Sequence, residues 1–89
     1  MEGRTHLFCP MGDDWYTANI QMDIENPVTI PDYIDVTRKL EEMDGGHLII
    51  EDAALEVAQF IHGQTGTTCK VSIQVDDARH IPVIVEVEA

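Results

Sequence analysis

Cys9 and Asp14 are the two residues of this 89-residue chain whose types and spacing best suit covalent chemistry. Both belong to a run of turn-forming residues that precedes an alternating segment beginning at Tyr16. A cysteine in such a loop can be exposed and nucleophilic, and a nearby carboxylate can carry protons to and from the atom that the sulfur attacks. The alternative is that Cys9 is a small buried hydrophobic residue beside Phe8. The other cysteine, Cys69, begins a predicted strand and is interpreted as a packing residue.

Glu51 is the next candidate for a functional role, because it stands where strand-like sequence changes into a helix. A carboxylate held at such a junction can accept two N–H bonds from the amide–amidine edge of a heterocycle, which orients the ring as well as binding it. The alternative is structural, since acidic residues stabilise the first turn of a helix. The residues alone leave both interpretations of Glu51 open.

Metal and nucleotide-phosphate sites are not predicted. Among the four histidines, His6 stands in the one close pair, with Cys9, and no second pair has the spacing that a structural zinc site requires. The Gly45-Gly46 pair is followed by neither a third glycine nor a Walker-type lysine, so it is not interpreted as a phosphate-binding loop. His80, beside two aspartates, is interpreted as part of a solvated turn. The sequence therefore predicts no metal and no cofactor.

The composition limits what else the chain can do. Seventeen Asp and Glu residues oppose five Lys and Arg residues, which gives a formal net charge of −12. Such a charge repels phosphate backbones, so it argues against nucleic acid as a partner and favours small neutral or cationic ligands. No apolar run approaches the roughly 20 residues of a membrane span, and two cysteines are too few for a disulfide scaffold. We expect a single domain over residues 1–89, without membrane contact, in the cytoplasm.

A small set of strands and helices must position the chemistry-bearing residues. Residues 16–25 alternate between apolar and polar side chains without interruption, which predicts a half-buried strand. Apolar residues then recur at helical spacing over residues 31–44. Pro31 suits the first turn of this helix, and the Gly45-Gly46 pair ends the run.

A second helix is predicted from Glu51 to Gly63, and alternating strands over residues 70–76 and 81–88 complete the chain as a hairpin. The residues before Cys9 are expected to add one short strand. The order (β)βααββ predicts an α+β fold, in which one antiparallel sheet carries both helices on its apolar face and leaves its other face polar. Because the sheet edges are unprotected in so small a domain, we expect self-association into a ring-shaped homo-oligomer.

This order of elements, with the residues Cys9-Pro10, Asp14-Trp15 and Glu51, resembles the tunnelling fold (T-fold). That fold is a ββααββ module whose copies join edge to edge and bind purine or pterin rings at subunit boundaries. Within it, the chain resembles the QueF-type nitrile reductases of the queuosine pathway and, more so, the archaeal QueF-like amidinotransferases that make archaeosine. The resemblance extends over residues 7–88.

The resemblance implies a role for each matching residue. Cys9 would attack the nitrile of a 7-cyano-7-deazaguanine to form a covalent thioimide, and Asp14 would move the protons. Glu51 would hold the base, and Trp15, which follows Asp14, would belong to the substrate-binding site. The implied partner is a purine-like or pterin-like small molecule.

The chain departs from the family pattern at three places. The spacing between cysteine and aspartate is longer in the family than between Cys9 and Asp14, and the residue before the base-binding glutamate is usually His but is Ile50 here. The Glu-Ser-Lys cofactor motif of the reductases is absent from residues 30–35. This absence favours an amidinotransferase over an NADPH-dependent reductase. The negative charge favours a free small substrate over transfer RNA.

Two other functions of the same fold stay open. One is a pterin enzyme resembling dihydroneopterin aldolase, for which Lys70 would have to be the acid–base lysine. The other is a non-catalytic assembly protein that keeps a purine- or pterin-binding pocket and has lost the chemistry. The departures at Ile50, in the loop between Cys9 and Asp14, and in the cofactor motif all favour this second alternative.

Overall fold

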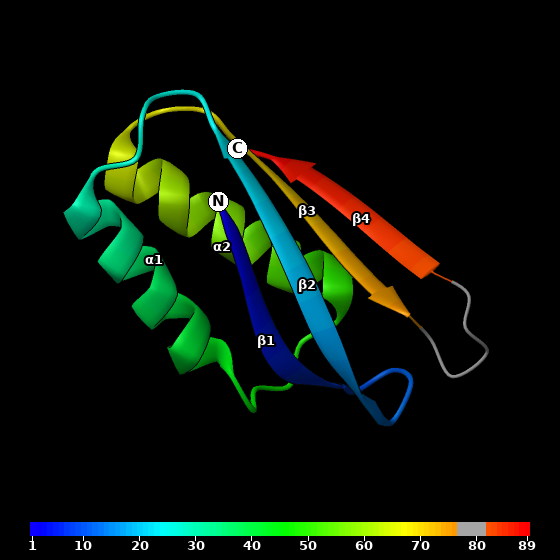
Figure 1. Ribbon diagram of the computed structural model, residues 1–89. Helices are drawn as coiled ribbons and strands as arrows, with labels where there is room; N and C mark the ends of the chain where they lie inside the picture. The colour runs from blue at the N-terminus through cyan, green and yellow to red at the C-terminus, as the bar shows by residue number, and fades with distance from the viewer. Residues whose placement is uncertain (77–81) are drawn as a thin grey trace.

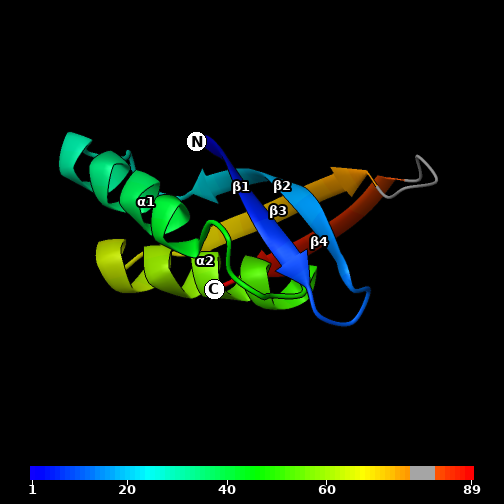
Figure 2. The same ribbon diagram turned by 90° about the horizontal axis from the view of Figure 1, so that it is seen from below.

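The computed structural model describes residues 1–76 and 82–89, which form a four-stranded antiparallel sheet and two helices (Figure 1). Both helices cover the same face of the sheet (Figure 2). The predicted α+β class and ββααββ order are confirmed. No helix in the described part of the chain is long and apolar enough to span a membrane. The elements in chain order are β1 (Glu2–Cys9), β2 (Asp14–Ile24), α1 (Ile30–Met43), α2 (Ile50–Thr65), β3 (Cys69–Asp76) and β4 (Pro82–Glu88).

The order of strands in the sheet follows the chain, and every neighbouring pair is antiparallel. The pleat directs alternate side chains toward the helices, so the apolar residues of the strands share one core with the inner faces of α1 and α2. The largest fully buried side chains are those of Leu7, Met22, Val36, Val57, Ile61, Cys69, Val71 and Ile73. The other face is polar, as predicted, and exposes residues such as Asn19, Gln21 and Asp23.

The first strand, β1, is longer than the short strand expected before Cys9, with eight residues. Its inward positions are hard to recognise in the sequence because two of them are not hydrophobic. At Gly3, the side chain of Leu40 occupies the space where a Cβ would stand. Thr5 is buried, and its hydroxyl donates to the Leu40 carbonyl at 3.2 Å. Leu7 is left as the one large apolar residue at these inward positions.

Helix α1 matches its predicted extent to within one residue at each end. Its N-cap is Thr29, whose side-chain oxygen accepts a hydrogen bond from the Asp32 N–H at 3.2 Å. Pro31 lies in the first turn, where its missing N–H would have had no helical partner. The cap and the proline together explain why the helix begins directly after the loop that follows β2.

Helix α2 continues past Gly63, so the prediction that it ends there is wrong. It ends at Thr65, followed by Gly66 in the left-handed conformation (φ 71°), whose N–H donates to the His62 carbonyl at 2.8 Å. A glycine can occupy a helix at moderate cost, whereas the positive φ of a C-terminal cap strongly favours glycine. The second glycine therefore ends the helix, and the first lies within it.

The two glycines predict opposite responses to alanine. Gly63→Ala should raise the free energy of unfolding by about 0.5–1 kcal/mol, because alanine restricts the unfolded chain and fits a helix. Nothing lies within 4 Å of the added Cβ. Gly66→Ala should lower the free energy by about 1 kcal/mol, because its φ is positive. Denaturant titration of both variants measures the difference, and a loss for Gly63→Ala as large as that for Gly66→Ala would contradict the assignment.

The last two strands form the predicted antiparallel hairpin, with Ile73 opposite Val85 and Asp76 opposite Pro82. The turn predicted at residues 77–79 and His80 lie outside the described residues. The strand order leaves β1 and β4 as the two outer strands of the sheet.

Candidate functional site

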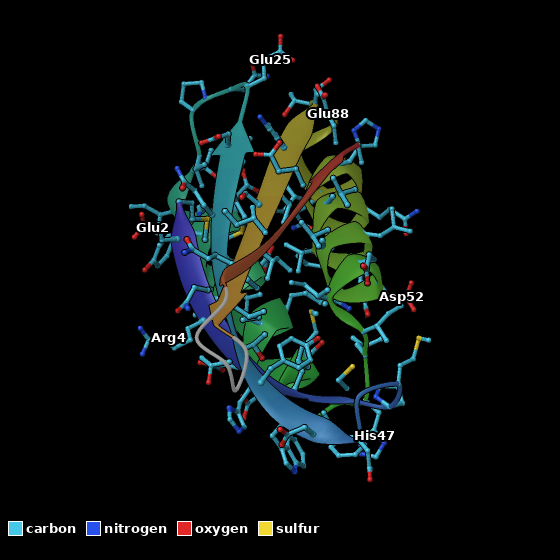
Figure 3. The ribbon with its side chains drawn as sticks, turned by 90° about the vertical axis from the view of Figure 1, so that its right-hand side faces the viewer. Glu2, Arg4, Glu25, His47, Asp52 and Glu88 are labelled. Carbon is cyan, nitrogen blue, oxygen red and sulfur yellow. The ribbon has the colours of Figure 1, made fainter. Side chains whose placement is uncertain are left out.

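The segment between the two helices brings the start of α2 to the end of β1. Phe8 N–H donates to the Gly46 carbonyl at 2.9 Å, and Leu48 N–H donates to the Phe8 carbonyl at 3.0 Å. Figure 3 labels His47 in this segment, near the turn between β1 and β2, and Asp52 in the first turn of α2. These bonds fasten the beginning of α2 beside the turn that carries two of the predicted site residues.

Cys9 and Asp14 lie directly opposite each other at the turn between β1 and β2. Opposed residues of an antiparallel pair project to the same face of a sheet. Here that face is the one covered by the helices, because Leu7 and Tyr16, two residues further along the strands, point inward. The Cys9 thiol is half-buried, and its sulfur accepts a hydrogen bond from the Gly12 N–H at 3.3 Å. The register thus sets the backbones of Cys9 and Asp14 opposite each other across this turn.

Tyr16 links this turn to the start of α2, although the sequence pattern assigned it only to the inner face of a strand. Its hydroxyl donates to the Leu48 carbonyl at 2.6 Å. Burial raises the pKa of the hydroxyl to about 12, with smaller contributions from negative charge on Cys9, Glu51 and Asp52. The hydroxyl therefore bonds the segment that leads into α2, and the charges of Cys9 and of the first turn of α2 act on its pKa. The sequence held one signal of this, because an inward tyrosine needs a partner for its hydroxyl.

Tyr16 should contribute to a loss of stability at alkaline pH. In the unfolded chain its pKa has the ordinary value of 10.0, and in the folded state it rises to about 12. The native state thus binds the proton more tightly, so this stabilisation is complete below pH 10 and is lost as the pH rises through about 12. Denaturant unfolding across this range should show a smaller decline for Tyr16→Phe than for the wild type. Equal declines would contradict the assignment.

Glu51 and Asp52 are exposed in the first turn of α2, whose N-cap residue, Ile49, supplies no side-chain bond. Two carboxylates at this position compensate the free N–H groups and positive end of the helix. The structural interpretation of Glu51 is therefore compatible with the ligand-binding one. Ile50, which stands where the family usually has His, is half-buried and packs against the core. Its side chain belongs to the core and adds no polar group to the site.

Trp15 does not join this group, because it points to the opposite face of the sheet from Cys9. Its indole is half exposed and stacks on the His6 ring, with 5.5 Å between ring centroids and 4° between planes. Phe8 meets it edge-on at 5.3 Å, and His47 lies 6.4 Å away. These four rings form an aromatic cluster on the outer side of the turn. Within this chain, Trp15 and Cys9 therefore lie on opposite faces of the sheet.

Lys70 lies far from this end of the molecule. It is the second residue of β3, which follows the C-terminus of α2, and its Nζ is 3.5 Å from a carboxylate oxygen of Glu86. The 16-residue α2 is about 24 Å long at 1.5 Å per residue, so its length separates Lys70 from Glu51. Within residues 1–76 and 82–89, no three His, Cys, Asp or Glu side chains gather as a metal site would require.

With its ββααββ order, its antiparallel sheet and both helices on one face, the chain has the tunnelling fold. Among solved structures, the crystal structure of the archaeosine synthase QueF-Like in the apo form is similar to it, with a TM-score of 0.78 and 13% sequence identity. The similarity covers 100% of this chain and 89% of that chain. No family model and no curated protein matches the sequence. The predicted resemblance to QueF-like proteins is confirmed for the fold.

Proposed function

We propose that this protein is an enzyme that attacks a nitrile on a 7-deazaguanine-type base, with Cys9 as the nucleophile. The observation that carries the proposal is the pairing of Cys9 with Asp14 on the helix-covered face, at the end where α2 brings Glu51. The fold shared with an archaeosine synthase supports the same class of chemistry.

The first step adds the thiol across the nitrile. The Cys9 sulfur forms a bond to the nitrile carbon, and the carbon–nitrogen triple bond becomes a double bond. The thiol proton passes to the Asp14 carboxylate and from there to the nitrile nitrogen, which gives a neutral thioimide. The Gly12 N–H, which donates to the sulfur at 3.3 Å, stabilises the negative charge that develops there.

The second step releases the base as an amidine. Ammonia or an amine adds to the thioimide carbon, the carbon–sulfur bond breaks, and the thiol recovers its proton. This sequence needs neither an oxidant nor a reductant, in keeping with the missing cofactor motif. Glu51 binds the amide–amidine edge of the base through two charge-assisted hydrogen bonds. The charge of −12 favours a free base or nucleoside over transfer RNA.

The site is completed in this proposal by a second copy of the chain. Asp14 and Glu51 are both exposed, so the proposed site is open to solvent in a single copy of the chain. The outer strands β1 and β4 offer their backbone edges for pairing between copies. Native mass spectrometry measures the number of copies.

Intact-mass spectrometry after incubation with 7-cyano-7-deazaguanine tests the proposal. The wild type should gain the mass of one base per chain, and Cys9→Ala should not. Cys69→Ala is the matched control, because it also removes one thiol but from a fully buried position; it should still form the adduct. A wild type that never gains this mass under native conditions would exclude the covalent mechanism.

Binding without chemistry is the second candidate, and the packing of Ile50 into the core favours it. A site that lacks the family's usual histidine could hold a purine or pterin ring through Glu51 and transform nothing. Calorimetric titration with guanine and pterin separates the two functions: binding without a mass adduct supports this candidate. Within one copy of the chain, Lys70 lies near the opposite end of α2 from Glu51, so an aldolase site would need the Lys70 of a neighbouring copy.

A further inference from the structure

We propose that Tyr16 is a positioning residue for the reaction proposed above: its hydroxyl fixes the separation between the nucleophile Cys9 and the base-binding Glu51. The inference rests on the proposed function and assigns a role in it to a residue outside the motifs. Tyr16 would not exchange a proton with the substrate. It would hold the two halves of the site together.

Tyr16 connects two segments that are distant in the chain. It follows Asp14 by two residues on β2, and its hydroxyl bonds the carbonyl of Leu48, three residues before Glu51. Leu48 is followed by Ile49, whose carbonyl accepts the first helical hydrogen bond of α2, from the Ala53 N–H at 3.0 Å. A shift of Leu48 would therefore move the first turn of the helix, and Glu51 with it.

The other bonds of the segment between the helices show why this one matters. Backbone bonds tie the segment to β1 at His6 and Phe8, and β1 carries Cys9. Tyr16 ties the same segment to β2, which carries Asp14. Burial raises the pKa of the phenol to about 12, so it remains a donor at any physiological pH. This bond and the strand register together fix the relative positions of the segments that carry Cys9, Asp14 and Glu51.

Thr5 provides a matched control for a hydroxyl that is only structural. Like Tyr16, it donates from an inward strand position to a backbone carbonyl, that of Leu40, at 3.2 Å. Its bond ties β1 to the end of α1, away from Glu51. Thr5→Val and Tyr16→Phe each remove a hydroxyl and leave a carbonyl without this partner, so both should lower the stability.

Three measurements on full-length wild type, Tyr16→Phe and Thr5→Val decide the proposal. The first is the rate at which 7-cyano-7-deazaguanine is captured as a mass adduct. The second is the alkylation rate of Cys9 by iodoacetamide, and the third is amide hydrogen exchange at the start of α2. Tyr16→Phe should slow capture by about ten- to a hundredfold, since small misplacement of reacting groups has effects of this size. Its alkylation should stay within about twofold of the wild type, because the thiol itself is unchanged.

Thr5→Val should leave both the capture rate and the exchange at residues 49–53 close to wild-type values, whereas Tyr16→Phe should accelerate that exchange. If the two variants capture the nitrile equally fast, the positioning role is excluded. If the wild type captures nothing, the proposed function fails, and exchange alone then decides whether Tyr16 holds the start of α2. Equal exchange in both variants would overturn that part as well.

Discussion

Asp14→Asn should slow formation of the thioimide by about 10²–10⁴-fold, the range typical of a lost general acid–base group. The amide cannot take the thiol proton or return one to the nitrile nitrogen. Asn is close to Asp in size, so the register that sets Asp14 opposite Cys9 should persist. Single-turnover mass spectrometry with 7-cyano-7-deazaguanine gives the rate, and the loss should appear in the rate of capture rather than in binding of the base.

Asp13→Asn is the control for this experiment. It removes the same charge one residue earlier, in the same turn, and Asn tolerates the positive φ of 54° at this position. Its capture rate should remain within a few-fold of the wild type, because the charge lost there is exposed and screened. If Asp13→Asn and Asp14→Asn slow capture equally, the effect is the general charge of the turn and Asp14 is not the proton carrier.

Glu51→Gln should weaken binding of the guanine-type base by about ten- to a hundredfold, the size expected when charge-assisted hydrogen bonds are lost. Gln keeps one acceptor oxygen but adds an NH₂ group, which opposes the N–H groups of the base edge. Calorimetry with guanine, or with 7-cyano-7-deazaguanine in a Cys9→Ala background, measures the change without interference from the covalent step.

Asp52→Asn provides the comparison for Glu51→Gln. Both residues lie in the first turn of α2 and favour the helix through the same negative charge, so both substitutions should cost similar, small amounts of stability. Only Glu51→Gln should change base affinity. A parallel loss of affinity in Asp52→Asn would show that the helix start as a whole attracts the ligand, and that Glu51 makes no specific bond.

The regular elements were predictable because their patterns are local. The alternation after Tyr16 and the helical spacing after Pro31 each define an element from neighbouring residues. Only part of β1 was predicted, because its inward residues Gly3 and Thr5 are not hydrophobic. Both contact Leu40 of α1, and a strand pattern cannot reveal such a contact. The end of α2 was misplaced for a similar reason: the sequence shows two glycines, and only the backbone conformation distinguishes them.

The candidate site residues came from sequence motifs, whereas the contacts between the segments that carry them are visible only in the structure. The strand register sets Cys9 opposite Asp14, and backbone bonds hold the segment before α2 against the end of β1, whereas Trp15 points to the other face of the sheet. Adjacency in sequence misleads at Trp15, because successive strand residues point to opposite sides. The role proposed for Tyr16 depends on a bond to the Leu48 carbonyl. A sequence pattern cannot predict which carbonyl a half-buried phenol will bond.

The two thiols can report on different stages of folding through their reactivity toward an alkylating reagent. Cys9 is paired with Asp14 across a short turn, whereas Cys69, which is fully buried, is paired with the distant Ile24 of β2. Pairing of distant segments is slow relative to turn formation. Burial raises the pKa of the Cys69 thiol, so the folded state slows its alkylation as well as shielding it. A pulse of alkylating reagent during refolding should therefore label Cys69 early and spare it later, while Cys9 stays reactive throughout.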